Sequence, residues 1–153
     1  MFLLVQLGKD RYALDIGQVT AVLPRLDMKA VPRAPPAVAG LCNYRGAPVP
    51  VIDLSELTLG RPASSRLSTR IVLVHFPDPA GGPQLLGLLA EQATQTLRRE
   101  PADFVPAGVD PDGASYLGPV TSDARGLIQR IDVLRLLPAP VRELLFNEPK
   151  QAS

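Results

Sequence analysis

Two prolines spaced two residues apart, Pro48 and Pro50, restrict most strongly what this chain can form. They lie in the second of two short apolar runs that flank the dipeptide Arg45-Gly46. Gly46 tolerates the positive φ that a tight hairpin turn requires. Because backbone N–H groups alternate sides along a strand, both prolines remove a donor from the same edge. The sequence therefore predicts a β-hairpin whose second strand can form a full ladder on one side only.

A short helix is predicted directly after this hairpin. Asp53 precedes the run 54–59, and an aspartate in that position accepts hydrogen bonds from the free N–H groups of a first helical turn. Glu56, three residues later, suits a capping box. Asp15 and Asp132 stand before similar short segments. We interpret all three aspartates as helix caps and not as an acid–base set.

Seventeen prolines and twelve glycines, spread through 153 residues, break the chain into short segments and disfavour long helices. The hydrophobic fraction of 46% indicates a folded core, either of one domain or of two small lobes that share one. Residues 90–98 fit a helical turn or a bent strand, and the residues alone leave both open. An all-β class follows, with further strands expected at 2–7, 11–14, 19–23, 71–76, 85–89, 116–121 and 126–131.

The side chains offer no set for catalysis or metal binding. One cysteine and one histidine supply neither an internal disulfide nor a zinc site. Cys42 and His75 each lie in an apolar run, so we expect both to be structural, and no serine or cysteine has an identifiable base. We therefore expect a protein that is not an enzyme and has no cofactor.

A net charge of +1 and 5% aromatic residues disfavour nucleic-acid binding. The alternative is an SH3-like or OB-like barrel that binds RNA through arginines in loops. Charge is also uneven, at +4 for residues 1–75 and −3 for residues 76–153, which suits two different protein contacts or arises by chance. The arginines of the RNA alternative are Arg61, Arg66, Arg70, Arg98 and Arg99.

The apolar start of the chain, residues 1–5, is interrupted by Gln6 and Lys9. It is too short for a membrane-spanning helix and lacks the basic start of a signal peptide. We expect a cytoplasmic protein that does not insert into a membrane.

The motif Asn43-x-Arg45-Gly46, followed by alternating prolines and valines up to Asp53, resembles the middle of the CheW-like adaptor domain. The opening hairpin, Pro32 and Pro35 before Gly40, and the segments 70–74, 86–89 and 117–132 are similar to other parts of that domain. The resemblance implies two intertwined five-stranded SH3-like barrels with short capped helices. It implies one two-lobed domain at 1–138 and a C-terminal extension at 139–153, with a short helix and then a tail.

The same resemblance implies a non-enzymatic adaptor in a bacterial chemosensory array. Such a protein links the cytoplasmic tips of methyl-accepting chemoreceptors to the regulatory domain of a CheA-like histidine kinase, and is recruited to membrane-bound receptor arrays. The partner-binding residues that we expect from it are Arg45, Asn43, Val49, Val19, Ala21, Val22, Leu88 and Glu91.

Two departures from the family pattern concern acidic residues. The family commonly shows V-x-E-V after its first helical turn, whereas this chain has Ala21 in place of the acid. A second family motif, G-x-x-V-D-x-V, keeps an acid here only as Glu91. These changes suit an accessory or alternative chemosensory pathway.

Arg45 suits either of two roles: an exposed turn residue, or a donor of paired N–H groups to a partner carboxylate. Asn43 better suits a structural role, with its side chain hydrogen-bonded to the turn backbone.

Overall fold

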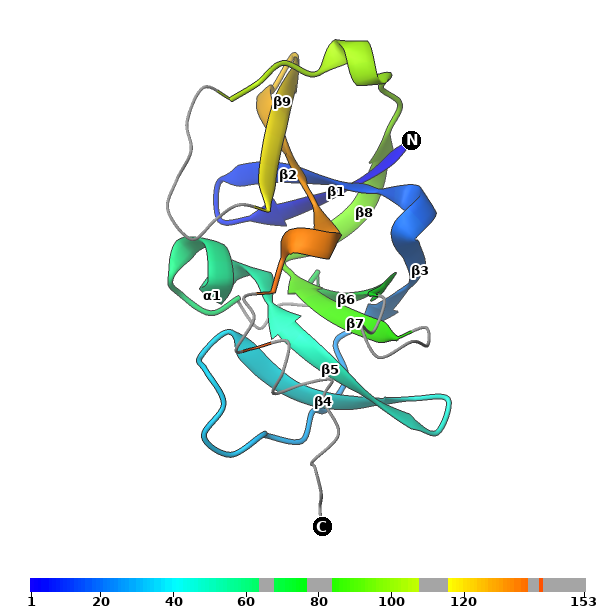
Figure 1. Ribbon diagram of the computed structural model, residues 1–153, viewed down its shortest axis with the longest axis vertical. Coiled ribbons are helices and arrows are strands. Elements are labelled where there is room, and N and C mark those ends of the chain that lie inside the picture. The colour runs from blue at the N-terminus through cyan, green and yellow to red at the C-terminus, as the bar shows by residue number, and fades with distance from the viewer. Residues whose placement is uncertain (64–67, 77–83, 108–115, 138–140, 142–153) are drawn as a thin grey trace.

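The computed structural model describes the chain except for residues 64–67, 77–83, 108–115, 138–140 and 142–153. Two five-stranded sheets dominate it, with the strand orders β8-β1-β2-β10-β9 and β3-β6-β7-β5-β4. We call the units built on these sheets the first and the second lobe, and Figure 1 shows the first above the second. The all-β expectation, with two five-stranded units, is confirmed.

The first lobe contains β1 (Phe2–Leu7), β2 (Asp10–Asp15), β8 (Gln92–Leu97), β9 (Leu117–Asp123) and β10 (Gly126–Ile131). The second contains β3 (Val19–Pro24), β4 (Val38–Tyr44), β5 (Ala47–Asp53), β6 (Arg70–His75) and β7 (Leu85–Ala90). The helices are α1 (Leu54–Leu59) and the 3₁₀ turns η1 (Ile16–Gln18), η2 (Pro101–Asp103) and η3 (Val133–Arg135). Residues 90–98 thus resolve mainly as the strand β8.

The two lobes exchange strands. The hairpin β1–β2 belongs to the first lobe, but β3, the next strand in the chain, pairs with β6 of the second. The later half of the chain does the reverse, because β6 and β7 pair in the second lobe while β8 pairs with β1 of the first. The hairpins β4–β5 and β9–β10 then join β7 and β2 by parallel pairing. Each lobe therefore needs strands from both halves of the sequence.

Apolar side chains form three clusters, one between the two sheets and one on the far face of each. Successive side chains of a strand point to opposite faces, so Leu3 and Val5 join the central cluster while Phe2 and Leu4 join the cluster of the first lobe. Each fully buried leucine or valine contributes roughly 1.5–3 kcal/mol relative to exposure. The cluster of the second lobe consists of Cys42, Val49, Val51, Ile71, Leu73 and Leu89.

The alternating prolines limit β5 as predicted. On one side β5 pairs with β4 along its length, with Pro48 opposite Asn43 and Pro50 opposite Leu41. On the other side the pairing with β7 begins only at Val51. The sheet therefore continues past β5, but only beyond the second proline.

All three predicted caps are confirmed. Asp15 Oδ1 accepts from the Gly17 N–H at 2.9 Å, and Asp132 Oδ1 accepts from the Leu134 N–H at 3.1 Å. Asp53 Oδ1 accepts from the Glu56 N–H at 3.1 Å at the start of α1. Each cap is followed by only one or two helical turns before the chain returns to a strand or loop.

Grouping the charged residues by lobe does not sharpen the uneven charge of the sequence, which is +4 for residues 1–75 and −3 for residues 76–153. Residues 16–90, which supply the second lobe, hold seven Lys/Arg and four Asp/Glu. Residues 1–15 and 91–137, which supply the first lobe, hold seven Lys/Arg and nine Asp/Glu. When only the residues that the structure describes are counted, the second lobe holds six Lys/Arg and three Asp/Glu and is net basic, whereas the first holds seven of each and is neutral. The short helix expected in the C-terminal extension lies outside the described residues, apart from Val141.

Candidate partner-binding surface

The turn between β4 and β5 presents Arg45 at an exposed tip. Both central residues have positive φ, 53° at Arg45 and 85° at Gly46, as a two-residue hairpin turn of type I′ requires. The sequence signalled this conformation only for Gly46. Asn43 Oδ1 accepts from the Gly46 N–H at 2.9 Å, so the expected bond from Asn43 to the turn backbone is present.

The Arg45 side chain is oriented by its neighbour. Its guanidinium carbon lies 5.2 Å from the centre of the Tyr44 ring, within cation–π range. No ion pair of Arg45 is recorded with any described residue. Its planar set of N–H donors is therefore available to a carboxylate from outside the chain.

The predicted contacts on β3 lie on the opposite edge of the same sheet. Val19 and Ala21 are half-buried and pack against the central and second-lobe clusters, while Val22 is 39% exposed. In the described part of the chain β3 pairs with β6 alone, so its other edge carries no strand. Arg45 and Val22 are thus exposed at two separate edges of the second lobe.

Two of the expected partner contacts belong to the core. Val49 is 3% exposed and Leu88 is fully buried, because both strands are covered on both faces. A partner cannot reach either side chain in this fold, and both leave the candidate surface. Glu91 makes a contact within the chain: its Oε1 accepts from the Gly8 N–H at 2.8 Å and so stabilises the β1–β2 turn.

Cys42 and His75 differ in their surroundings. Cys42 is 2% exposed, as expected, and burial raises the pKa of its thiol above the ordinary value. His75 was expected within a buried strand run, but it is the exposed last residue of β6, where its Nε2 lies 3.0 Å from Thr20 Oγ1. Burial makes the Cys42 thiol inaccessible, and the Thr20–His75 pair, although within hydrogen-bond distance, is exposed and has no described third residue that orients the imidazole.

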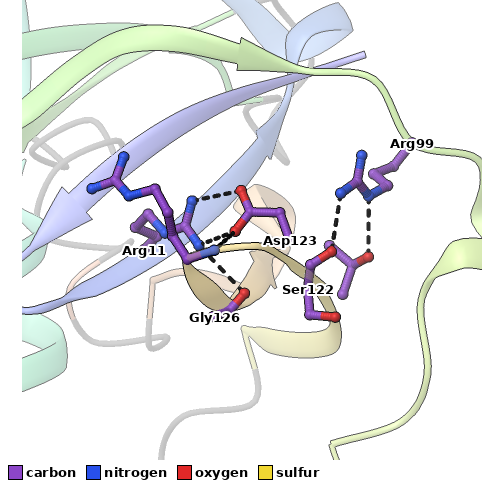
Figure 2. A network of polar contacts seen from close by, with 7 residues as sticks. Arg11, Arg99, Ser122, Asp123 and Gly126 are labelled. Carbon is purple, nitrogen blue, oxygen red and sulfur yellow. Dashed lines mark hydrogen bonds and ion pairs between the residues drawn. The ribbon is translucent and has the colours of Figure 1, made fainter.

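A polar network that the sequence did not suggest fixes the β9–β10 hairpin to β2, as Figure 2 shows. Arg11 donates two N–H groups to the Asp123 carboxylate, at 2.9 and 2.6 Å, and a third contact to the Gly126 carbonyl at 3.3 Å. The Arg11 hydrogen bonds hold the pKa of Asp123 well below its usual range. Arg99 donates to Thr121 Oγ1 and to the Ser122 carbonyl from the other side. The partners are up to 115 residues apart, and no local motif announces them.

The arginines of the RNA alternative do not form one track. Arg98 and Arg99 follow β8 in the first lobe, and Arg99 is engaged in the network above. Arg61 and Arg70 lie in the second-lobe half of the chain, and Arg70 donates to the Thr69 carbonyl. Arg66 is outside the described residues. This arrangement does not support RNA binding.

A groove of about 530 Å³ lies beside η1 and η3. The charges that line it are already paired, with Arg130 3.7 Å from Asp15 and Arg135 3.5 Å from Asp132.

Among the residues described, no group of three His, Cys, Asp or Glu side chains is placed to hold a metal ion. Within the same residues, no helix has both the length and the apolar character needed to cross a bilayer.

Comparison with known proteins gives one consistent result. The model of the CheW-like domain matches residues 1–141. The chain is 23% identical over 154 residues to Chemotaxis protein CheW of Klebsiella aerogenes, covering 97% of this chain and 88% of that one. It is 23% identical over 148 residues to Chemotaxis protein CheW of Treponema pallidum, covering 93% and 84%. The crystal structure of the scaffolding protein TtCheW from Thermoanaerobacter tengcongensis shares the fold, with a TM-score of 0.80, 23% identity and coverage of 95% and 97%.

Proposed function

The chain belongs to the CheW-like domain family, and from this premise we propose that it is a non-enzymatic adaptor of a chemosensory array. In this role it couples the cytoplasmic tips of methyl-accepting chemoreceptors to the regulatory domain of a CheA-like histidine kinase. The family match over residues 1–141 and the two-lobed fold support it. An adaptor must contact two proteins at once, and a net basic second lobe and a neutral first lobe offer two chemically different surfaces.

The observation that carries this proposal is the conformation of Arg45. An arginine with φ of 53° is strained, at a cost of about 1 kcal/mol, in a turn where asparagine or glycine would adopt the same backbone more easily. The arginine is nevertheless exposed, stacked on Tyr44 and without a recorded carboxylate partner. Backbone strain kept at an exposed position is typical of a site used for binding.

The decisive variant is Arg45→Asn, because it separates stability from binding. Asn-Gly is the preferred pair for this turn, so the melting temperature should stay the same or rise. Loss of an anchor costs about 1–4 kcal/mol of binding. Affinity for the kinase regulatory domain or the receptor tip should fall tenfold or more, where a factor of ten is about 1.4 kcal/mol.

Surface plasmon resonance against both fragments measures this. Arg98→Asn is the matched control, because Arg98 is an exposed arginine of the first lobe without positive φ. Val22→Ser tests the β3 edge in the same way, since Val22 is the exposed apolar residue of that strand. Unchanged affinity of Arg45→Asn for both fragments would reduce Arg45 to a turn residue, and absence of binding by the parent protein to both would refute the adaptor role.

The departures at Ala21 and Glu91 support an accessory or alternative pathway. Ala21 supplies no carboxylate, and one Glu91 oxygen is engaged by the Gly8 N–H. Both acidic positions of the family pattern are therefore changed in this chain. We further propose that residues 1–138 form the adaptor domain, that 139–153 are an extension to it, and that the protein acts at membrane-bound receptor arrays without inserting into the bilayer.

A further inference from the structure

We propose that the second lobe carries a docking surface for an acidic protein partner, with Arg33 as a second anchor in addition to Arg45. The proposal rests on the adaptor function above for the identity of the partners. This surface, the basic edge, consists of β4 and the segment before it. Figure 1 shows that segment at one end of β4 and the β4–β5 turn at the other. The exposed cations of the basic edge are Arg25, Lys29, Arg33 and Arg45.

The segment before β4 has a fixed position. Lys29 and Leu41 exchange two backbone hydrogen bonds of 2.8 Å each. Gly40 lies beneath this contact with φ of 148°, and a Cβ there would be 2.7 Å from the Lys29 carbonyl oxygen. The close approach ties the segment to the edge of β4, so the side chains that it carries are held relative to the strand.

Arg33 lies in a turn where its backbone is strained. The Ala34 N–H donates to the Val31 carbonyl at 3.2 Å, which places Pro32 and Arg33 in the two central positions. Proline followed by a residue of positive φ is the pattern of a type II turn, in which the second central position favours glycine or asparagine. Arg33 occupies it with φ of 64°.

Arg33 and Arg45 are the only non-glycine residues with positive φ in the described part of the chain, and both are arginines. Each stands where a smaller residue would relieve strain, so backbone conformation gives no reason for arginine at either position. Both are exposed, and no ion pair to a described residue is recorded for either. A contact outside the chain gives both arginines a role.

Charge identifies the kind of partner. Residues 25–45 contain four cations and one acid, Asp27, and all five side chains are exposed. Between the cations lie half-buried apolar residues, including Leu26 and Met28, that pack on the second-lobe cluster. Guanidinium groups beside apolar surface suit a protein face rich in aspartate and glutamate.

The test uses the full chain with Arg33→Asn, Arg45→Asn, the double variant and the control Arg98→Asn. Arg33→Asn should raise the melting temperature and weaken binding to the kinase regulatory domain or the receptor tip at least fivefold. The loss of affinity between low and high salt should also become smaller, because one cation has left the interface. Arg33→Lys should keep most of the affinity without the gain in melting temperature, and Arg98→Asn should change neither.

The outcomes separate this inference from the adaptor function. If Arg33→Asn binds both fragments as the parent does, Arg33 is not an anchor and the adaptor function stands. If Arg33→Asn lowers the melting temperature, the strain reasoning is wrong. If the parent binds neither fragment, the adaptor function fails, and an oligoglutamate peptide followed by NMR decides the basic edge. Salt-sensitive shifts centred on residues 25–45 would support it, and their absence would overturn it.

Discussion

Replacing Asp53 by alanine should destabilise the fold more than replacing either of the other capping aspartates. Asp53 is 6% exposed and uses both carboxylate oxygens. Its Oδ1 accepts from the Glu56 N–H at 3.1 Å, and its Oδ2 accepts from the Ala63 N–H at 2.9 Å. One side chain therefore starts α1 and also fixes the segment that leaves it. Asp15 and Asp132 cap one turn each, and their side chains are 44% and 46% exposed.

The size of the effect follows from the two bonds. Loss of an N-cap costs about 0.5–2 kcal/mol. A hydrogen bond to a charged group contributes about 1.5–3 kcal/mol, so Asp53→Ala should cost roughly 2–5 kcal/mol in total. At about 2–4 °C per kcal/mol for a chain of this size, the melting temperature should fall by roughly 4–20 °C. Asp132→Ala should lose only the cap and the small contribution, about 0–1 kcal/mol, of its exposed ion pair with Arg135.

Urea unfolding followed by circular dichroism measures these differences, provided that the slope with urea stays constant. Asp53→Asn is the informative intermediate, because its single amide oxygen can serve one N–H but not both. It should fall between the parent and Asp53→Ala. Equal stability losses for Asp53→Ala and Asp132→Ala would show that the bond to Ala63 contributes nothing, and the reasoning from two bonds would then be refuted.

Three further predictions concern the lobes. The depressed pKa of Asp123 means that the stability contributed by its pairing with Arg11 is present above the ordinary aspartate pKa and is lost as the pH falls. Asp123→Asn should therefore be less stable than the parent at pH 7, and the difference between their urea midpoints should become smaller below about pH 4. A difference that stays constant with pH would contradict this assignment. Gly87→Ala should cost about 1–3 kcal/mol in urea unfolding, because its Cβ would lie 3.0 Å from methyl groups of Ile71 and Val51. Gly118→Ala should be tolerated, because its Cβ would have its nearest contact at 3.4 Å and its backbone does not have a positive φ. Residues 1–63 and 68–153, produced separately, should each lack a cooperative thermal transition and regain one on mixing, and independent folding of either fragment would count against exchange of strands as a requirement for stability.

Local chemistry allowed much of this fold to be predicted. The three capping aspartates, the β4–β5 hairpin and the restricted edge of β5 each depend on residues that are close in the chain. The strand exchange depends on pairings such as that of Phe2 with Leu97, for which the sequence carries no local signal. The resemblance to a family supplied the two intertwined barrels, and the residues alone supplied only hairpins.

The candidate site was predicted less completely. Arg45 and Val22 are exposed as a contact surface requires, but Val49 and Leu88 are core residues. An apolar run gives the same pattern whether one face or both faces of its strand are covered, so the sequence could not exclude them. The strain at Arg33 and Arg45 was also hidden, because only glycine announces a positive φ in a sequence.

The exchange of strands between the lobes also sets the order in which the two sheets can be completed during synthesis. During synthesis the hairpin β1–β2 leaves the ribosome first, yet the strands that complete its sheet are β8, β9 and β10, which begin at Gln92. The second sheet needs β7, so it can close before the first, even though part of the first emerges earlier. Until β8 and β10 have been synthesised, the outer edges of β1 and β2 stay open to pairing with other chains. Slow translation through residues 70–131 would lengthen that exposure, and folding yield in the cell should depend on how fast this stretch is synthesised.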